Sequence, residues 1–349
     1  MQKLRTPFRH LIAVAALLSL AACGGGGGGT DSPTQPSTPS DIAPSAGTLQ
    51  ASVAPLTYTA GSVQESAMTA VNQARLAAGV GLLAQSAQID VAAQAHATYV
   101  SLNGSVSHDE VATAAGFYEA TPGQRIAKAG FSASTTSEVI GGTGISRRGS
   151  DCALGLLGSL YHGAVLLSSF THAGVGTALD GLGVPICVIN LASTSQQQLG
   201  QIMPAGTFGA YPYNGQTNVF ETFYAGYEVP RPPVSLFPNL MVGTPVHANV
   251  RNADYLNFRQ AGTLSLTVTQ FELRDAAGNL VDAHIMAEKA AKAGTGVTLN
   301  ADNILPDGFV VLVPKSPLLK GQTYTARFSA TLKAGGTPLT KTWSFTTNP

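Results

Sequence analysis

Two histidines stand out among the seven in this 349-residue chain because neither falls on an apolar stripe. His162 is preceded at helical spacing by Ser159 and two glycines, and such a face of small side chains leaves room for a groove. His108 follows a short polar loop and precedes two acidic residues. Imidazole and carboxylate groups can ligate a metal ion, exchange protons or order loops by hydrogen bonds. Both positions are therefore candidates for a functional cleft.

The other histidines and the motifs of known catalysts suggest less chemistry. His96 lies on the apolar stripe of an expected helix and is predicted to be a core residue, while His172, His247 and His284 are expected to be structural or exposed. The chain has neither a Gly-x-Ser-x-Gly elbow nor a His-Glu-x-x-His motif. Ser159 and His162 could form a nucleophile–base pair if an acid lay nearby, so hydrolysis stays open as the alternative to binding.

Composition and charge exclude some classes of function. Lys plus Arg equals Asp plus Glu at 19 each, so the formal net charge is zero, which argues against an electrostatic nucleic-acid binder. The hydrophobic fraction of 44% excludes wholesale disorder and supplies enough apolar material for a core in each half. The charged fraction of 11% is low for a cytosolic enzyme and favours an exported protein.

The N-terminus has the form of a targeting segment. Three basic residues precede an apolar run that is too short to span a bilayer and ends in Leu20-Ala21-Ala22-Cys23. Small residues before a cysteine resemble the lipobox of bacterial lipoproteins. That resemblance implies a signal peptide over residues 1–22, a lipid on Cys23, and, since glycine follows, attachment to the outer membrane. The alternative is an ordinary signal peptide with an incidental cysteine.

The segment after Cys23 and the two remaining cysteines are consistent with export. Six glycines and a Ser/Thr/Pro-rich stretch predict a flexible tether over residues 23–61. Without the leader, 16 basic and 19 acidic residues give a net charge of −3. Cys152 and Cys187 form an even pair in an oxidising compartment, and a bond between them would close a loop of about 36 residues, worth roughly 4 kcal/mol in the chain-entropy model. Two buried free thiols are the alternative.

Periodicity predicts helices followed by a hairpin in the first folded half. The expected helices cover residues 62–79, 86–102, 121–130 and 150–167, with Ser62 and Ser150 as capping residues. Two strand-like runs, 173–179 and 184–191, flank a turn at 180–183. The second run is nearly all apolar, so we expect a strand buried on both faces with helices covering both sides of the sheet.

A series of short motifs in this half resembles the CAP superfamily of cysteine-rich secretory, antigen 5 and pathogenesis-related proteins. The motifs occur in the family's order over residues 62–200: Asn72-x-x-Arg75, Gly81-Leu82, Ala95-His96-Ala97, His108, Pro122-Gly123-Gln124-Arg125, Ala129-Gly130-Phe131, Glu138, Ser159-x-x-His162 and Gly174-Val175-Gly176. The resemblance implies an α–β–α sandwich with a cleft formed by His108, Glu138 and His162.

The resemblance leaves the chemistry of this cleft open. Eukaryotic relatives carry a second Glu that aligns best with Ser159 here, so one acid is missing. Two histidines and a carboxylate could bind zinc or another divalent metal, or they could form a polar cluster that orders the loops. Some relatives bind sterols or fatty acids.

The second half is expected to be all-β. Alternating apolar residues separated by turns predict a β-sandwich over residues 205–349, after a linker near 197–207. Leu266 and Phe271 are out of phase, which suggests a bulge, and residues 284–292 suggest a helical insertion. The last thirty or so residues resemble bacterial immunoglobulin-like modules, which are usually spacers or adhesion units.

The sequence thus predicts an α+β chain, with a CAP-type α–β–α sandwich followed by an immunoglobulin-like β-sandwich. The predicted function is that of a lipid-anchored binding protein of the outer membrane. Its cleft would hold a lipid, a metal ion or an envelope partner, and it would bind no nucleic acid. The alternative is a metal-assisted or serine-type hydrolase of the cell envelope that uses His108, Glu138, His162 and Ser159.

Overall fold

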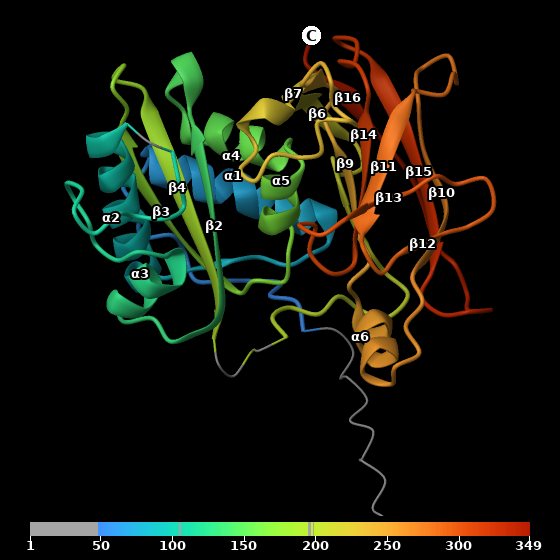
Figure 1. The fold of residues 1–349 in the computed structure, drawn as a ribbon, viewed down its shortest axis with the longest axis horizontal. Coiled ribbons are helices and arrows are strands. Elements are labelled where there is room, and N and C mark those ends of the chain that lie inside the picture. The colour runs from blue at the N-terminus through green and yellow to red at the C-terminus, as the bar shows by residue number, and fades with distance from the viewer. Residues whose placement is uncertain (1–47, 105, 195–196, 198) are drawn as a thin grey trace, which may run out of the picture. The chain divides into compact units, whose positions relative to one another are not determined.

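The first half of the chain is a four-stranded sheet between two layers of helices (Figure 1). The computed structural model describes residues 48–349 except Ser105, Ser195, Gln196 and Gln198, and the described residues belong to one compact unit. Cys23, the expected leader and most of the expected tether lie outside the described residues. Within that described part, no helix is long and apolar enough to cross a membrane.

Three helices begin where the sequence predicts. Ser62 caps α1 (Val63–Ala78), and Ser86 caps α2 (Ala87–Asn103). The third helix, α3 (Pro122–Lys128), has a complete capping box between Thr121 and Gln124 and proline at its first position. These caps fix the directions in which the three helices leave their loops.

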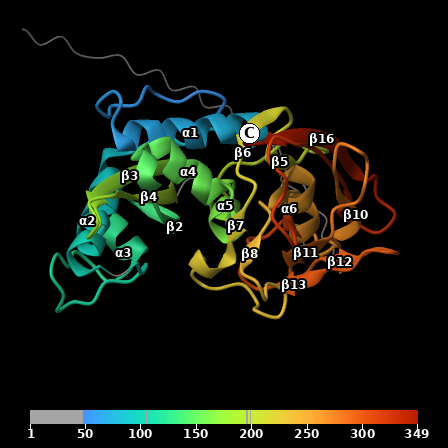
Figure 2. The ribbon, with the colours of Figure 1, turned by 90° about the horizontal axis from the view of Figure 1, so that it is seen from above.

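The sheet is ordered β1-β3-β4-β2. Its strands are β1 (Ala84–Gln85), β2 (Ala133–Gly142), β3 (His172–Leu179) and β4 (Pro185–Thr194). As predicted, β3 and β4 form a hairpin, and β4 is buried along nine of its ten residues. Helices α2 and α3 pack on one face, and α1 packs with α4 and α5 on the other (Figure 2). The α–β–α layering expected from the resemblance is therefore present.

The prediction of one continuous helix over residues 150–167 is wrong. The chain makes a 3-10 turn η1 (Gly144–Ser146) and two short helices, α4 (Gly149–Leu157) and α5 (Tyr161–Leu166). Arg148, not Ser150, occupies the N-cap position, and it makes no side-chain cap bond. The break falls after Gly158, where the backbone and the hydroxyl of Ser159 both donate to the carbonyl of Leu156.

The second half contains two five-stranded sheets. One has the order β12-β10-β15-β16-β6 and the other β13-β11-β14-β9-β5. Their strands are β5 (Gly209–Tyr211), β6 (Gln216–Val219), β9 (Val246–Asn249), β10 (Thr267–Arg274), β11 (Ala283–Glu288), β12 (Lys292–Ala293), β13 (Asn300–Asp302), β14 (Phe309–Pro314), β15 (Thr323–Thr331) and β16 (Leu339–Thr347). One apolar cluster draws residues from both sheets, as the predicted β-sandwich requires. The bulge expected in β10 is confirmed between Val268 and Gln270.

Smaller elements complete this half, and its helix lies elsewhere than predicted. They are β7 (Phe223–Tyr224), η3 (Ala225–Tyr227), β8 (Met241–Val242) and α6 (Ala253–Gln260). The predicted helical insertion at 284–292 is wrong, since most of it is strand β11, whose residues pair with β14. The helix of this half is α6 instead, and the side chain of Asn252 caps it.

The segments expected to be tether and linker are partly packed against the folded halves. Gln201 is 3% exposed, accepts a hydrogen bond from the backbone of Gln50, and donates to the carbonyls of Leu82 and Phe170. The hydroxyl of Tyr58 bonds the carboxylate of Asp90. The two bonds that Gln201 donates satisfy backbone carbonyls of the first half.

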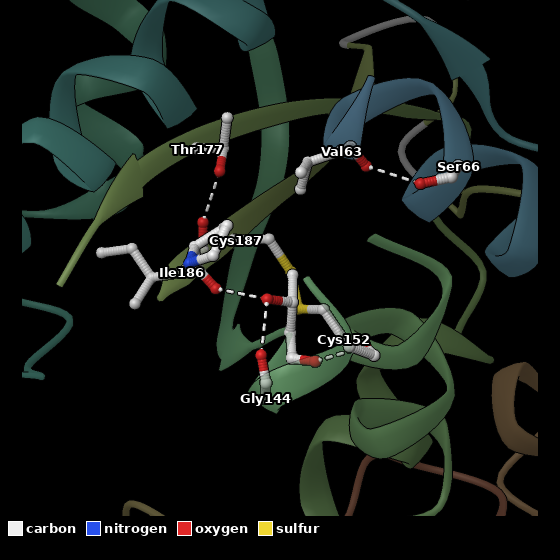
Figure 3. The surroundings of a disulfide bond; sticks show 10 residues. Val63, Ser66, Gly144, Cys152, Thr177, Ile186 and Cys187 are labelled. Carbon is white, nitrogen blue, oxygen red and sulfur yellow. Dashed lines mark hydrogen bonds between the residues drawn. A yellow bond between two sulfur atoms is a disulfide. The ribbon is translucent and has the colours of Figure 1, made fainter. Parts of the chain in front are cut away.

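A disulfide joins Cys152 of α4 to Cys187 of β4, as predicted (Figure 3). Both side chains are buried in the apolar cluster that α1, α4 and the sheet share. The same cluster continues into the second half through residues such as Phe309 and Val311 of β14. The two halves therefore share this apolar cluster.

Candidate functional site

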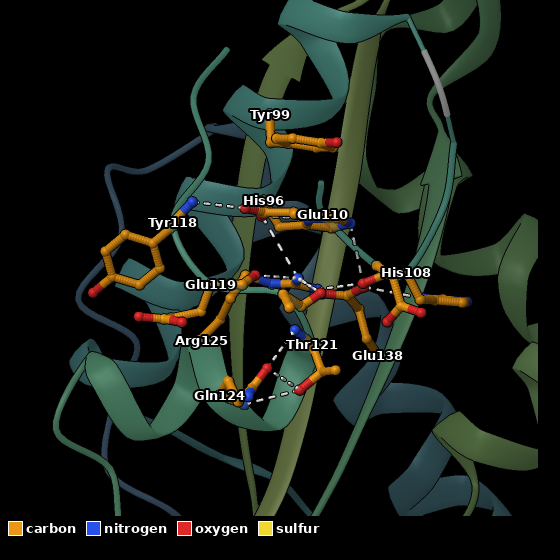
Figure 4. Close-up of polar contacts among 12 residues, drawn as sticks. His96, Tyr99, His108, Glu110, Tyr118, Glu119, Thr121, Gln124, Arg125 and Glu138 are labelled. Atoms are coloured by element: carbon orange, nitrogen blue, oxygen red, sulfur yellow. Dashed lines mark hydrogen bonds and ion pairs between the residues drawn. The ribbon is translucent and has the colours of Figure 1, made fainter. Parts of the chain in front are cut away.

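A buried group of four ionisable side chains lies between α2, α3 and β2 (Figure 4). His96, Glu110, Arg125 and Glu138 all have side chains that are 0% exposed. Nη2 of Arg125 donates to Oε2 of Glu138 at 2.9 Å, and Nη1 lies 3.6 Å from Oε1 of Glu110. A buried charge is tolerated only when it is paired and hydrogen-bonded, and here one guanidinium faces both carboxylates.

His96 connects this buried group to the loop that carries His108. Its Nδ1 lies 2.8 Å from Oε1 of Glu110, and its Nε2 lies 2.8 Å from the carbonyl of Ser107. A carbonyl oxygen can only accept, so Nε2 is the donor in the bond to Ser107. The backbone of Tyr118 donates to the other oxygen of Glu110 at 2.7 Å. The prediction that His96 is a core residue is confirmed, and the side chain also orders the loop between α2 and α3.

His108 stands at the boundary between this buried group and solvent. Its side chain is 30% exposed, and its Nδ1 lies 3.0 Å from Oε1 of Glu138. Its carbonyl accepts a hydrogen bond from Nη2 of Arg125 at 2.8 Å. The capping box of α3 fixes the helix that carries Arg125, so a local sequence signal determines where the His108 backbone lies.

His162, the second residue of α5, meets an acid from the other half of the chain. Its Nδ1 lies 2.8 Å from Oε2 of Glu228 and 3.2 Å from the hydroxyl of Ser159. The other oxygen of Glu228 accepts a hydrogen bond from the backbone of Tyr161 at 2.8 Å. The acid that faces His162 is therefore residue 228, which lies far from it in the sequence.

A cavity of about 450 Å³ brings the three predicted cleft residues together. His108, Glu138 and His162 line it, and Val229, Pro230 and Ile304 of the second half contribute apolar wall. Ser159 lines a different, neighbouring cavity. The site is thus a polar cleft of the first half that the second half partly walls in.

The geometry disfavours two of the chemistries that the sequence left open. Among the described residues, no group of three or more His, Cys, Asp or Glu side chains could hold a metal ion. Both oxygens of Glu138 already face Arg125 and His108. In a serine triad the nucleophile and the acid bind opposite ring nitrogens. Ser159 and Glu228 both approach the same nitrogen of His162, so this arrangement does not match a triad.

Two groups beside the cleft have strongly shifted pKa values. Burial lowers the pKa of His247 to about 4, and its Nε2 lies 3.1 Å from the carbonyl of Leu160, just before α5. Burial and the hydrogen bond to Asp302 raise the pKa of Tyr161. Both groups are held in their neutral forms at neutral pH, and both join the two halves next to His162.

Sequence reasoning missed Glu110, Arg125 and Glu228 as members of the site. Arg125 lies inside a quoted family motif, and an arginine on the buried side of a short helix is itself a sign of a buried acid. Glu110 is the second of the two acidic residues that follow His108. Glu228 lies in the proline-rich stretch of the second half, and no local pattern indicates that it reaches α5.

The fold and the site define an α+β protein with a walled polar cleft at the boundary of its two halves. No family model and no curated protein matches the chain. Among solved structures, it is similar to an extracellular protein containing an SCP domain from Bacillus anthracis, with 24% identity over 38% of this chain and 40% of that one, at a TM-score of 0.32. It is also similar to an outer surface protein from Borrelia burgdorferi, with 19% identity over 37% of this chain and 90% of that one, at a TM-score of 0.32. The SCP domain is the type of domain that the sequence motifs resemble.

Proposed function

We propose that this chain is an exported CAP-type binding protein whose cleft holds a small amphipathic molecule with an anionic group, such as a fatty acid. The observation that carries the proposal is the composition of the 450 Å³ cavity. Its volume falls within the range of small-molecule sites. His108 and His162 offer ring nitrogens to an anionic head, while Val165, Val229 and Ile304 offer apolar wall to a short chain.

The buried ion network supports this function by holding the cleft in shape before a ligand arrives. Glu138 keeps His108 in place, and Arg125 keeps Glu138 in place. A preorganised site loses less conformational freedom on binding and so retains more of its affinity. Hydrolysis is not proposed, because the contacts of His162 do not form a triad.

Laurate binding to the delipidated full chain tests the proposal. Isothermal titration calorimetry should show binding by the wild type and a loss of about tenfold or more in affinity for His108→Ala and His162→Ala, because each removes a donor to the carboxylate. His284→Ala, the same change in the β-sandwich, is the control and should leave the affinity unchanged. Equal laurate affinities in all four proteins, or no laurate binding by the wild type, would contradict the proposal.

We further propose that Cys23 anchors the chain to the outer membrane through a lipid. The support is the Leu-Ala-Ala-Cys pattern and the glycine-rich segment after it. Two or more acyl chains give stable anchoring, whereas one is marginal. Cys23→Ser should therefore move the protein from the membrane pellet to the soluble fraction after fractionation of the cells. A variant that still pellets with the membrane would disprove the anchor.

A further inference from the structure

A second cavity, of about 230 Å³, contains His162 in its wall but is otherwise built from different residues. The first half contributes the glycine-rich edges of β2 and α4 and the buried Cys152. The second half contributes the segment Phe220–Glu228. None of these residues of the second half lines the proposed fatty-acid cleft, although Glu228 contacts His162, which lines both cavities.

Four aromatic rings from one short segment line this second cavity. Phe220, Phe223, Tyr224 and Tyr227 all belong to its wall. The rings of Tyr224 and Tyr227 stand edge to face, with centroids 4.7 Å apart and planes inclined by 67°. Tyr227 is 81% exposed, although large aromatic side chains are usually covered. The segment thus presents aromatic surface both inside the cavity and at its solvent edge.

A buried carboxylate faces the same cavity. Glu228 is 1% exposed, and its Oε2 has no hydrogen-bond partner among the described residues, although Nδ1 of His162 lies 2.8 Å away as an ion-pair contact. Its Oε1 accepts one hydrogen bond, from the backbone of Tyr161. A carboxylate offers about four acceptor positions. Glu228 therefore places a buried carboxylate in the wall of the cavity, with one hydrogen bond on Oε1 and one ion-pair contact on Oε2.

We propose that this cavity binds a small organic ammonium cation of about the size of choline. The faces of aromatic rings attract cations, and cages of aromatic rings recognise quaternary ammonium groups in particular. Glu228 adds a formal negative charge beside those rings. A cavity of about 150 Å³ admits benzene, so about 230 Å³ has room for a trimethylammonium group and its short alcohol arm. The cation could be free or could be the headgroup of a phosphatidylcholine.

Choline and its neutral isostere 3,3-dimethyl-1-butanol distinguish a cation site from a merely apolar cavity, because they differ in charge and hardly in shape. In calorimetric titrations of the full chain, choline should bind about tenfold or more tightly than the alcohol. Glu228→Gln keeps an oxygen for the Tyr161 backbone but loses the charge. This variant should therefore bind choline more weakly than the wild type does, while its affinity for the alcohol should stay unchanged.

Two further variants locate the binding within the molecule. A side chain added at Gly155 meets no atom within 4 Å of its Cβ, so Gly155→Leu should fill the cavity and abolish the binding of both probes without disturbing the helix. Laurate binding should persist in that variant, so this inference and the proposed function can fail separately. Glu221→Gln, which changes a carboxylate on the same segment outside the cavity wall, is the matched control and should bind choline as the wild type does.

Vesicles identify the source of the cation. Binding of free choline supports a free cation. Cosedimentation with phosphatidylcholine vesicles but not with phosphatidylglycerol vesicles, in the absence of choline binding, assigns the cavity to a lipid headgroup. The inference is overturned if choline and the alcohol bind equally, if Glu228→Gln leaves choline affinity unchanged, or if neither choline nor phosphatidylcholine binds.

Discussion

Arg125 is the residue on which the charge balance of the cleft depends. Its guanidinium faces both Glu110 and Glu138, and all three side chains are fully buried. Removing one partner of a buried ion pair leaves an uncompensated charge, which typically costs 3–5 kcal/mol. We therefore expect Arg125→Met to lower the free energy of unfolding by about that amount in urea denaturation.

Lys128 on the same helix provides the comparison. It pairs with Glu119 at 3.1 Å, but both side chains are substantially exposed. Exposed pairs contribute about 0–1 kcal/mol, so Lys128→Met should cost less than about 1 kcal/mol. Similar losses in the two variants would show that the buried network does not stabilise the fold.

His247 gives the protein a predictable dependence on pH. Its pKa is lowered to about 4 in the folded protein, while an unfolded histidine titrates near 6.5. Below pH 6.5 the unfolded chain binds a proton that the folded chain refuses, so stability is complete above about pH 6.5 and falls as the pH drops towards 4. The loss amounts to about 2 kcal/mol at pH 5.

The variant His247→Gln should remove this part of the pH dependence. Urea denaturation at pH 7 and at pH 5 measures this effect. The loss in free energy of unfolding between these two pH values should be about 2 kcal/mol smaller in the variant than in the wild type. If the variant loses as much stability as the wild type between these pH values, then another group causes the loss.

Individual site residues were predictable only where a local pattern marked them. His108 and His162 are visible because polar or small neighbours place them off the apolar stripes, and Glu138 is visible only through the family motif. Glu228 acts at a distance of 66 positions from His162, and nothing in the intervening sequence encodes that contact. Its position results from the packing of the second half, which periodicity does not describe.

At the scale of elements, the packing of β3 explains why the motif Gly174-Val175-Gly176 has glycine at two positions. A Cβ on Gly176 would lie 2.3 Å from the backbone of Ala93, and a Cβ on Gly174 would lie 2.3 Å from the backbone nitrogen of Asp90. Helix α2 therefore packs directly on the strand at these two positions. This close approach brings His96 of α2 beside the sheet that carries Glu138.

Gly176→Ala should push α2 away from the sheet and lower the free energy of unfolding by about 1–3 kcal/mol, the usual cost of overpacking. Gly181 in the β3–β4 turn provides the control, because a Cβ there meets no atom within 4 Å. Gly181→Ala should change stability by no more than about 0.5 kcal/mol. Thermal melts of the two variants measure the contrast, and equal melting temperatures would refute the packing argument.

Elements with strong caps were predictable, and elements set by tertiary context were not. The Ser62, Ser86 and Thr121 caps act through bonds to residues three positions on, so sequence reveals them. The apolar stripe from 153 to 167 stays in phase across Gly158, which conceals the break between α4 and α5. Strand β11 was mistaken for a helix because its alanine-rich continuation resembles one, whereas its pairing with β14 determines its form.

At the scale of the whole molecule, the two halves are joined by a shared core and by specific polar bonds. Tyr161 donates to Asp302 at 2.7 Å, and Asn249 donates to the carbonyl of Leu167 at 3.1 Å. A Cβ on Gly163 would lie 2.9 Å from the ring of His247, so α5 and β9 approach closely. The cleft and the aromatic cavity both take wall residues from each half.

This continuity predicts that the chain unfolds in one step. Far-ultraviolet and near-ultraviolet circular dichroism should report a single coincident urea transition, because α5 cannot keep its buried face once the β-sandwich opens. A fragment of residues 48–204 should lose that transition and bind a hydrophobic dye, since it exposes the part of the core that Phe309 and Val311 cover. Two separate transitions, or a fragment that unfolds cooperatively, would instead make the first half an independent domain. Its cleft would then need the second half only as a wall.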